Sequence, residues 1–390
     1  MNILFVNDYG FPRGGAERLV DHERSELEAR GHGTTLLSLD SPRLYGPAEA
    51  WVHPFEDPGS RLGSLWHQLR HRRAQRALEL AVRETHPDLI HYHTLTRLGP
   101  GVMEGGTGVP AIVTLHDYAL LYPRLRSVLP GQPFCDVGGF ACCPRHAGLP
   151  RYAFERLRTA IHRRLLNRAR WVLVPSEYMG NVASACGVER VRVCANGVPA
   201  QSSAADAAAR PPRILYVGRV EREKGVFELV SAFELLADRN ESVELRVAGS
   251  GAELSALGER IRGSRHVGRI KLLGTLAANE LRGAYSTARV VALPSLWPEP
   301  FGLTGIEAMA AGTPVVGSGR GGMTEWLRDG LNGLRADPMD TAAFSSALEA
   351  VMTDEGLFRR LARGGRDTAG HFTLERHVDC LESAYGEATR

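Results

Sequence analysis

Lysine is nearly missing from this 390-residue chain, because only Lys224 and Lys271 among its 47 basic side chains are lysines. A long apolar segment is missing too. No window approaches the roughly 20 apolar residues that a membrane-spanning helix needs, and the short apolar run at residues 3–6 is stopped by Asn7 and Asp8. We therefore expect neither a signal peptide nor a membrane span.

Cysteine is also sparse, with six residues scattered along the chain. This density in a chain of enzyme size predicts reduced thiols and a cytoplasmic protein rather than a disulfide scaffold. Cys135, Cys142, Cys143 and His146 could together bind zinc, but an adjacent cysteine pair matches no standard zinc spacing. The favoured interpretation of this segment is an ordered loop with free thiols.

The length allows two domains, and 43% hydrophobic with 23% charged residues is typical of a globular protein. Charge differs between the halves: residues 1–197 carry a net charge of +5 and the remainder −2. We expect the first half to meet something anionic. The excess is too small to predict a nucleic-acid partner.

Residues 294–322 contain two glutamates, Glu299 and Glu307, separated by seven residues. One continuous helix would place them about 12 Å apart along its axis, too far to share a small ligand. However, Pro298 and Pro300 flank the first glutamate, so Glu299 should lie on an extended loop, with a helix starting at about Gly302. Glu307 would then follow the first helical turn.

The amides of Phe301, Gly302 and Leu303 would be unpaired at this helix start, which favours binding of a phosphate. A carboxylate on each side could accept hydrogen bonds from vicinal hydroxyls. A ligand with phosphate in the middle and a polyol on each side is a nucleoside-diphosphate sugar, which is the ligand that this stretch predicts. The alternative is an ordinary loop and helix whose glutamates are solvated.

The chain opens on a predicted buried strand at residues 2–7, a loop containing Gly14 and Gly15, and a predicted helix at 16–30. A strand, a glycine loop and a helix can hold phosphate, although this loop also fits a plain turn. It lacks the Gly-x-Gly-x-x-Gly pattern, which disfavours a dinucleotide-dependent oxidoreductase.

Further strands are predicted at 34–39, 88–92, 111–115, 171–174 and 191–194, with helices between them. This alternation predicts a doubly wound parallel sheet, which binds ligands at the carboxyl ends of its strands. His116 stands at such an end. A single histidine there is more often structural than functional.

A linker at 201–212 precedes a second α/β unit with predicted strands at 214–217, 243–248, 270–273, 290–293 and 315–316. Its first loop starts at Gly218 and carries Arg219 and Lys224, which could bind one diphosphate from two sides. Surface salt bridges with Glu221 or Glu223 are the alternative.

The string Glu-Pro-Phe-Gly-Leu, followed by Glu-Ala-Met-Ala-Ala-Gly-Thr-Pro-Val-Val and Gly-Gly-Met-Thr-Glu, resembles the donor-binding motif of glycosyltransferase family 4. The resemblance extends over essentially the whole chain and is most specific between Gly218 and Glu325. It implies retaining enzymes of the GT-B fold, with two Rossmann-like, doubly wound parallel-sheet domains facing across a cleft. Domains at 1–197 (acceptor side) and 198–373 (donor side) are expected, with a last helix at about 374–390 returning to the first.

The resemblance also implies roles for individual residues. The loop with Gly14 and Gly15 would close over the donor diphosphate, and His116 would face the donor sugar. Arg219 and Lys224 would bind the diphosphate. Glu299 would hold sugar hydroxyls, and Glu307 the ribose diol.

No Asp-x-Asp-like metal site adjoins these motifs, so we expect no essential metal, with the cations and helix amides stabilising the leaving group. The expected reaction is transfer of a sugar, from a UDP- or GDP-sugar, to a hydroxyl of a glycan, a lipid-linked glycan or a small molecule. A nucleotide-sugar epimerase of the same fold and a non-catalytic nucleotide-sugar-binding protein are the alternatives.

Residues 151–170 are rich in arginine, with Phe154, Leu157, Ile161 and Leu165 on one helical face. Such a helix could contact an anionic membrane surface from the cytoplasm. Docking on the sheet with a solvated basic face is the alternative.

Overall fold

The computed structural model describes residues 1–10, 14–38, 72–121, 149–199 and 210–390. The four candidate zinc ligands, Cys135, Cys142, Cys143 and His146, lie outside these ranges. None of the three cysteines inside them, Cys186, Cys194 and Cys380, forms a disulfide.

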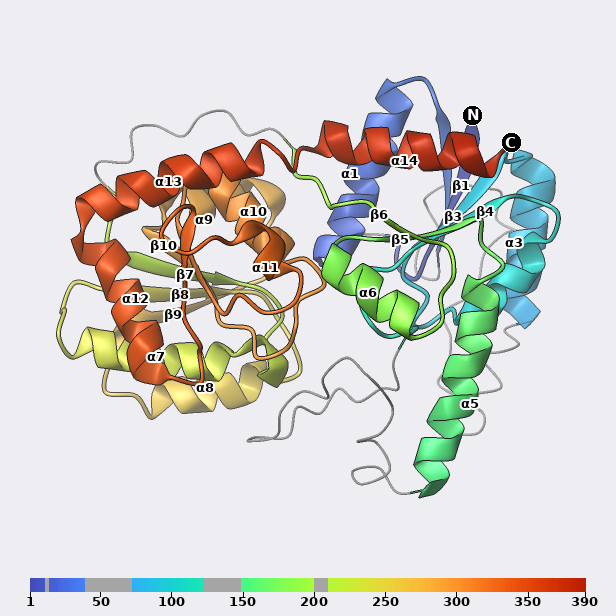
Figure 1. Ribbon diagram of the computed structural model, residues 1–390. Helices are drawn as coiled ribbons and strands as arrows, with labels where there is room; N and C mark the ends of the chain where they lie inside the picture. The colour runs from blue at the N-terminus through green and yellow to red at the C-terminus, as the bar shows by residue number, and fades with distance from the viewer. Residues whose placement is uncertain (11–13, 39–71, 122–148, 200–209) are drawn as a thin grey trace. The chain divides into compact units, whose positions relative to one another are not determined.

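The chain forms two compact units, each with a parallel sheet covered by helices (Figure 1). One unit contains the described residues up to Ala195 together with Leu374–Arg390, and the other contains Asn196–Thr373.

The sheet of the first unit has six strands in the order β2-β1-β3-β4-β5-β6, all paired in parallel. Its strands are β1 (Asn2–Asn7), β2 (Gly33–Ser38), β3 (Leu89–Tyr92), β4 (Ala111–Thr114), β5 (Trp171–Val174) and β6 (Val191–Val193). The helices are α1 (Gly15–Ala29), α3 (Arg72–Thr85), α5 (Leu149–Leu166), α6 (Glu177–Ala185) and α14 (Leu374–Ala388), with the short 3₁₀ helix η2 (Pro100–Gly106). The strand order reverses between β1 and β3, where open parallel sheets bind ligands at their carboxyl edge.

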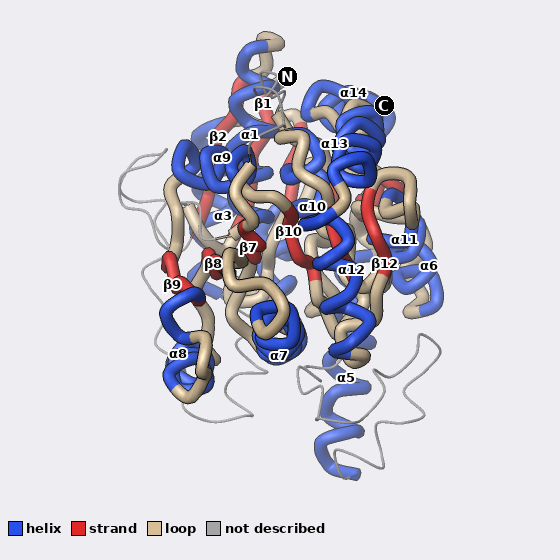
Figure 2. Tube along the Cα trace, turned by 90° about the vertical axis from the view of Figure 1, so that its left-hand side faces the viewer, coloured by secondary structure: helices blue, strands red, loops and turns tan. Residues whose placement is uncertain are grey.

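The sheet of the second unit has the order β12-β11-β10-β7-β8-β9, which is the Rossmann order with its reversal between β7 and β10. Its strands are β7 (Arg213–Val217), β8 (Glu244–Ala248), β9 (Ile270–Gly274), β10 (Val290–Leu293), β11 (Val315–Gly317) and β12 (Gly333–Arg335). The helices are α7 (Val226–Ala237), α8 (Leu254–Arg262), α9 (Ala278–Thr287), α10 (Leu303–Ala310), α11 (Met323–Trp326), α12 (Thr341–Thr353) and α13 (Glu355–Ala369), with 3₁₀ helices η5 (Arg222–Lys224) and η6 (Val267–Arg269). Figure 2 shows β7, β8 and β9 side by side with α7 and α8 next to them.

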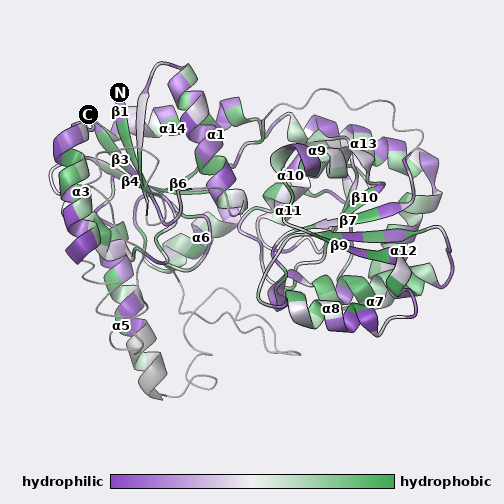
Figure 3. Ribbon diagram, turned by 180° about the vertical axis from the view of Figure 1, so that it is seen from behind, coloured by the Kyte–Doolittle hydropathy of each residue, from purple (hydrophilic) through white to green (hydrophobic). Residues whose placement is uncertain are grey.

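Each unit has its own hydrophobic core, and the central strands are largely apolar while the outer helices carry polar stretches (Figure 3). Parallel strands covered on both faces need apolar side chains on both faces, which explains their continuous apolar runs. In the second unit Ile214, Phe233 and Val290 are fully buried in this core.

The last helix, α14, belongs to the core of the first unit. Its Val378, Leu381 and Tyr385 are fully buried in the same cluster as Phe5 of β1. At its outer side, the Arg30 guanidinium donates hydrogen bonds to Asp379 and Glu382 of α14, at 2.6 and 2.7 Å.

The predicted class, two doubly wound α/β units of the GT-B type, is confirmed. Two details of the sequence-based description are wrong. The three-residue strand β12 was not predicted, because it begins at a glycine and carries no apolar run. The predicted apolar face of α5 is not buried along its length, since Leu157 is 55% exposed.

The buried face of α5 runs instead through Arg158, His162 and Leu165. Arg158 donates a hydrogen bond to the carbonyl of Ala119 at 3.3 Å, and its guanidinium lies 3.5 Å from His162 Nδ1. Part of the buried face of α5 is therefore polar, and a search for an apolar helical face cannot predict it.

Candidate functional site

The loop after β7 contacts the loop after β10. The strand order of the sheet reverses between these two strands. Leu296 donates its amide hydrogen to the carbonyl of Glu223 at 2.8 Å. Gly225 has φ 68°, and a Cβ there would lie 1.8 Å from the carbonyl oxygen of Pro294. Only glycine fits this position, so the end of the Arg219–Lys224 loop is fixed next to Glu299.

Lys224 and Glu299 contact each other directly. The Lys224 Nζ lies 2.7 and 2.9 Å from the two carboxylate oxygens, and both side chains are mostly buried. The hydroxyl of Ser295 donates to the same carboxylate, and Lys224 Nζ lies 4.8 Å from the centre of the Trp297 ring. Burial alone would raise the pKa of Glu299, but the charge and hydrogen bond of Lys224 hold it below its usual value.

The backbone of Glu299 is extended, as predicted from its flanking prolines. It forms an isolated parallel bridge with Gly321, in which the amide of Gly322 donates to the Glu299 carbonyl at 2.7 Å. The loops after β7, β10 and β11 thus all converge on Glu299.

Helix α10 begins at Leu303, with Gly302 as its N-cap at φ 88°. A Cβ at Gly302 would lie 2.9 Å from Met323 Cγ, so a side chain there would be strained and crowded. Phe301 is buried, and its carbonyl accepts a 2.7 Å hydrogen bond from the indole of Trp326. This contact fixes the start of α10, where the first amides have no partner inside the helix.

Glu307 lies on α10 just after its first turn, as predicted, and its carboxylate accepts a hydrogen bond from the Tyr285 hydroxyl at 2.6 Å. Tyr285 is fully buried on α9. The hydroxyl therefore holds Glu307 in a defined orientation, and the second unit brings Lys224, Glu299 and Glu307 to one edge of its sheet.

Arg219 follows Gly218 and lies in the same loop as Lys224, but it pairs with acidic neighbours. Its guanidinium lies 2.6 Å from Glu221 and 3.9 Å from Glu223. Burial raises the pKa of Glu223 to about 7. The salt-bridge alternative thus describes Arg219 in this structure, and a diphosphate contact for Arg219 stays a prediction.

In the first unit, His116 lies two residues after the end of β4 and is half-buried. Its Nε2 lies 3.0 Å from Nδ1 of His93, which follows β3. Burial lowers the pKa of His116 to about 4, so the imidazole is neutral at neutral pH.

Gly14 and Gly15 begin α1 after the end of β1. Gly14 is the extended N-cap residue, and Gly15 is the first helical residue. Residues 11–13 of this loop lie outside the described ranges.

Sequence reasoning missed three residues that support these sites. Tyr285 and Ser295 orient the two glutamates, and Asp8 ties the end of β1 to the segment after β3. The Asp8 carboxylate accepts hydrogen bonds from the amides of Arg97 and Leu98 at 2.8 and 2.9 Å, and burial raises its pKa to about 6. The sequence offered a signal for Asp8, because this aspartate directly follows the predicted strand at residues 2–7. Tyr285 and Ser295 carry no comparable signal.

In the part of the chain that the structure describes, no helix has the length and apolarity needed to cross a bilayer.

Comparison with known proteins agrees with this architecture. Residues 199–368 match the family described as glycosyl transferases group 1, and residues 13–202 match Glycosyltransferase Family 4. Together the two matches extend over both units. The chain belongs to the family 4 type of glycosyltransferases.

Among individual relatives, one is similar over most of the chain and another over less than half of it. A glycogen synthase of Mycobacterium tuberculosis is 29% identical over 387 residues, covering 94% of this chain and 89% of that protein. A D-inositol 3-phosphate glycosyltransferase of Salinispora arenicola is 34% identical over 184 residues, which cover 45% of this chain and 41% of that protein.

Two solved structures share the fold. Sucrose-phosphate synthase from Thermosynechococcus elongatus has a TM-score of 0.75 at 21% identity, covering 99% of this chain and 98% of that one. HepE from Anabaena, solved in complex with UDP-glucose, has a TM-score of 0.69 at 20% identity, covering 98% and 100%.

Proposed function

We propose that this glycosyltransferase transfers a hexosyl group from a nucleoside-diphosphate sugar to a hydroxyl of its acceptor, with retention at the anomeric carbon. The observation that carries the proposal is the convergence of Lys224, Glu299 and the start of α10 at one edge of the second sheet, with Glu307 one turn further on. The UDP-glucose bound to HepE supports a UDP-sugar as donor, and a GDP-sugar remains within the proposal.

Each group has a proposed partner on the donor. The first amides of α10 and the Lys224 ammonium bind the diphosphate, and Arg219 joins them when it leaves Glu221. Glu307 accepts hydrogen bonds from the ribose diol. Glu299 accepts hydrogen bonds from hydroxyls of the sugar.

The charge that develops on the leaving diphosphate is stabilised by these fixed cations and amides, so the reaction needs no metal ion. We assign no carboxylate as a covalent nucleophile. The acceptor hydroxyl attacks from the face that the diphosphate leaves, and the leaving phosphate takes its proton.

His116 of the first unit contacts the donor sugar, and the loop with Gly14 and Gly15 covers the diphosphate. The acceptor is a glycan, a lipid-linked glycan or a small molecule. We place the reaction in the cytoplasm, in carbohydrate biosynthesis.

A donor screen tests the proposal directly. Thermal unfolding is measured with UDP-glucose, UDP-galactose, UDP-N-acetylglucosamine and GDP-mannose, with and without EDTA, and we expect one of them to raise the melting temperature in both conditions. Acceptor trials with that donor, followed by mass detection and by NMR of the anomeric proton, identify the product and its configuration.

Three results would contradict the proposal: an inverted product, complete loss of turnover in EDTA, or conversion of the donor sugar with no acceptor present. The last result would identify an epimerase.

A further inference from the structure

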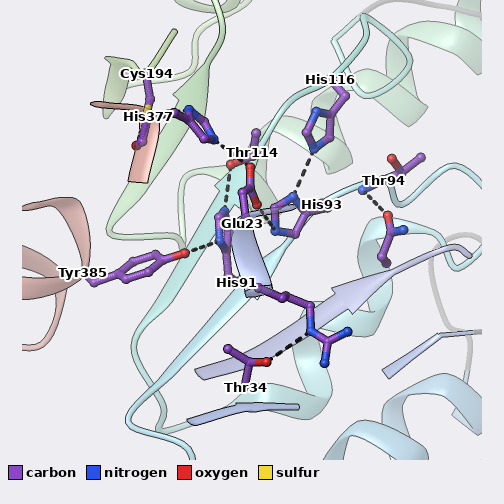
Figure 4. A network of polar contacts seen from close by, with 12 residues as sticks. Glu23, Thr34, His91, His93, Thr94, Thr114, His116, Cys194, His377 and Tyr385 are labelled. Atoms are coloured by element: carbon purple, nitrogen blue, oxygen red, sulfur yellow. Dashed lines mark hydrogen bonds and ion pairs between the residues drawn. The ribbon is translucent and has the colours of Figure 1, made fainter. Parts of the chain in front are cut away.

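A chain of buried polar groups leads from α14 to His116 in the first unit (Figure 4). Its first member is His377, whose Nε2 lies 2.7 Å from Oε1 of Glu23 on α1. The other carboxylate oxygen of Glu23 lies 3.7 Å from Nε2 of His93, and His93 Nδ1 lies 3.0 Å from His116 Nε2. Glu23, His93 and His377 are buried, with exposures of 0%, 1% and 3%.

The protons in this chain can be placed one after another, starting at His377. Its Nδ1 lies 2.8 Å from the carbonyl oxygen of Ala195, which can only accept, so Nδ1 carries a hydrogen. A second proton must lie between His377 Nε2 and Glu23. Burial alone would lower the pKa of His377, but the hydrogen bond and charge of Glu23 raise it above its usual value. Whichever of the two groups carries the shared proton, Oε2 of Glu23 keeps its lone pairs.

Glu23 then determines the position of the proton on His93. Oε2 of Glu23 can only accept, and neither this oxygen nor His93 Nε2 has a hydrogen-bond partner within the described residues. Two buried acceptors facing each other at 3.7 Å would be unfavourable, so His93 Nε2 carries the hydrogen that points at Glu23.

His93 Nδ1 is consequently a lone pair, and it can accept only if His116 Nε2 is the donor. The neutral His116 then has its own lone pair on Nδ1. For that nitrogen, no partner is found among the residues that the structure describes.

We propose that Glu23 and His93 are positioning residues that fix His116 as its Nε2–H tautomer, so that Nδ1 accepts a hydrogen bond from a hydroxyl of the donor sugar. The proposal rests on the proposed function for the role of His116. The tautomer itself is a property of the free protein.

A metal ion is the competing occupant of the space between Glu23 and His93. Ligand atoms of Glu23, His91 and His93 lie within 4.8 Å of one another. However, both ring nitrogens of His91 already lie 2.7 Å from hydroxyls, those of Tyr385 and Thr114. Among the described residues, this leaves Glu23 Oε2 and His93 Nε2 as the two ligand atoms of this group without partners. Two ligand atoms suit a single proton between them better than a metal ion.

The test is ¹⁵N NMR of histidine side chains in the substrate-free protein, with His116 assigned through His116→Asn. We expect Nε2 of His116 to resonate as a protonated nitrogen and Nδ1 as a lone-pair nitrogen. In His93→Phe and Glu23→Leu, His116 should become a mixture of tautomers. Tyr385→Phe is the control, because it removes the hydroxyl that contacts His91 and leaves the chain of contacts to His116 intact.

Turnover provides the second measurement. We expect kcat to fall about tenfold in His93→Phe and Glu23→Leu, with the KM of the acceptor unchanged, and to stay within about twofold in Tyr385→Phe. If Glu23→Leu fails to fold, the His93→Phe protein decides, because a phenyl ring can take the place of the imidazole that stacks on Phe5.

Three results would overturn the proposal. They are an Nδ1–H tautomer of His116 in the unaltered protein, an unchanged tautomer in both variants, and an equimolar divalent metal that holds His93 and is removed by chelation. If the protein shows no transfer with any donor, the proposed function fails while the NMR result still decides the tautomer.

Discussion

Lys224 and Glu299 form an ion pair, although the proposed function assigns them to different parts of the donor. Both side chains are mostly buried, so the charge of each is compensated by the other rather than by solvent. A bound diphosphate would be a second anion near Lys224. Before the donor binds, the Glu299 carboxylate holds the Lys224 ammonium in place.

We expect Lys224→Ala to lower kcat by about 10²-fold, because it removes a cation whose interaction strengthens as the diphosphate leaves. It also leaves the Glu299 carboxylate without its partner, so a loss of stability of a few kcal/mol should accompany it. Steady-state kinetics and urea denaturation measure the two effects.

The other lysine provides the control. Lys271 is half-exposed and lies 3.5 Å from Glu244, so Lys271→Ala should leave both kcat and stability nearly unchanged. An unchanged kcat in a folded Lys224→Ala protein would remove Lys224 from the mechanism.

Calorimetry should distinguish the roles of Glu299 and Glu307. Glu307→Gln should weaken binding of the free nucleoside diphosphate by about tenfold, because its proposed partner is the ribose. Glu299→Gln should leave this ligand nearly unaffected and weaken the intact sugar donor. Equal losses for both ligands in both variants would contradict the division of roles.

Tyr285→Phe tests how Glu307 is oriented. The variant removes only the hydroxyl that donates to the Glu307 carboxylate at 2.6 Å. We expect a smaller loss of nucleoside-diphosphate affinity than in Glu307→Gln, about threefold, in the same calorimetric measurement. A loss larger than that of Glu307→Gln would show that the ribose contact is made by Tyr285 itself.

Donor binding should depend on pH through Glu223. Its pKa is raised to about 7, so the carboxyl group gains a proton as the pH falls through 7 and the loop becomes less negative. A bound diphosphate favours this protonated form, so affinity for an intact nucleoside-diphosphate sugar should increase about threefold from pH 8 to pH 6.

Glu223→Gln should bind at all pH values as the protein does at pH 6. The matched control is Glu253→Gln, which removes the acidic partner of Arg222 and should keep the pH dependence. The same pH dependence in Glu223→Gln would assign the titration to another group.

Contact between α5 and an anionic membrane is tested with liposomes. Arg163 and Arg164 are exposed near the end of this helix, and each should contribute about 1 kcal/mol to binding of acidic vesicles, decreasing with salt. Changing both to Ser should weaken sedimentation with acidic vesicles at low salt. The control is the exposed pair Arg359 and Arg360 on α13, and the absence of any acidic-vesicle binding would favour a soluble acceptor.

Much of the fold follows from local sequence. The strands β1, β5 and β10 have the predicted bounds because each is an apolar run between polar or turn-forming residues. The start of α10 follows from Pro300 and Gly302, which act on their own backbone. In contrast, β12 forms through its pairing with β11, and its own three residues give no signal.

The site is predictable only in part, for the same reason. The motifs identify Lys224, Glu299 and Glu307 as ligand-binding residues. Their contacts depend on partners far along the chain: Lys224 and Glu299 are 75 positions apart, and Tyr285 and Glu307 are 22 apart. Such pairs become neighbours only after the sheet has brought its strands together.

The place of α14 in the first unit has a consequence for biosynthesis. Val378, Leu381, Ala384 and Tyr385 complete the core around β1, yet they are made after the whole of the second unit. During synthesis domains fold as units, the amino-terminal one first. Here the amino-terminal unit cannot complete its core until α14 has left the ribosome. The second unit can therefore fold first, and the first sheet stays exposed to chaperones for longest.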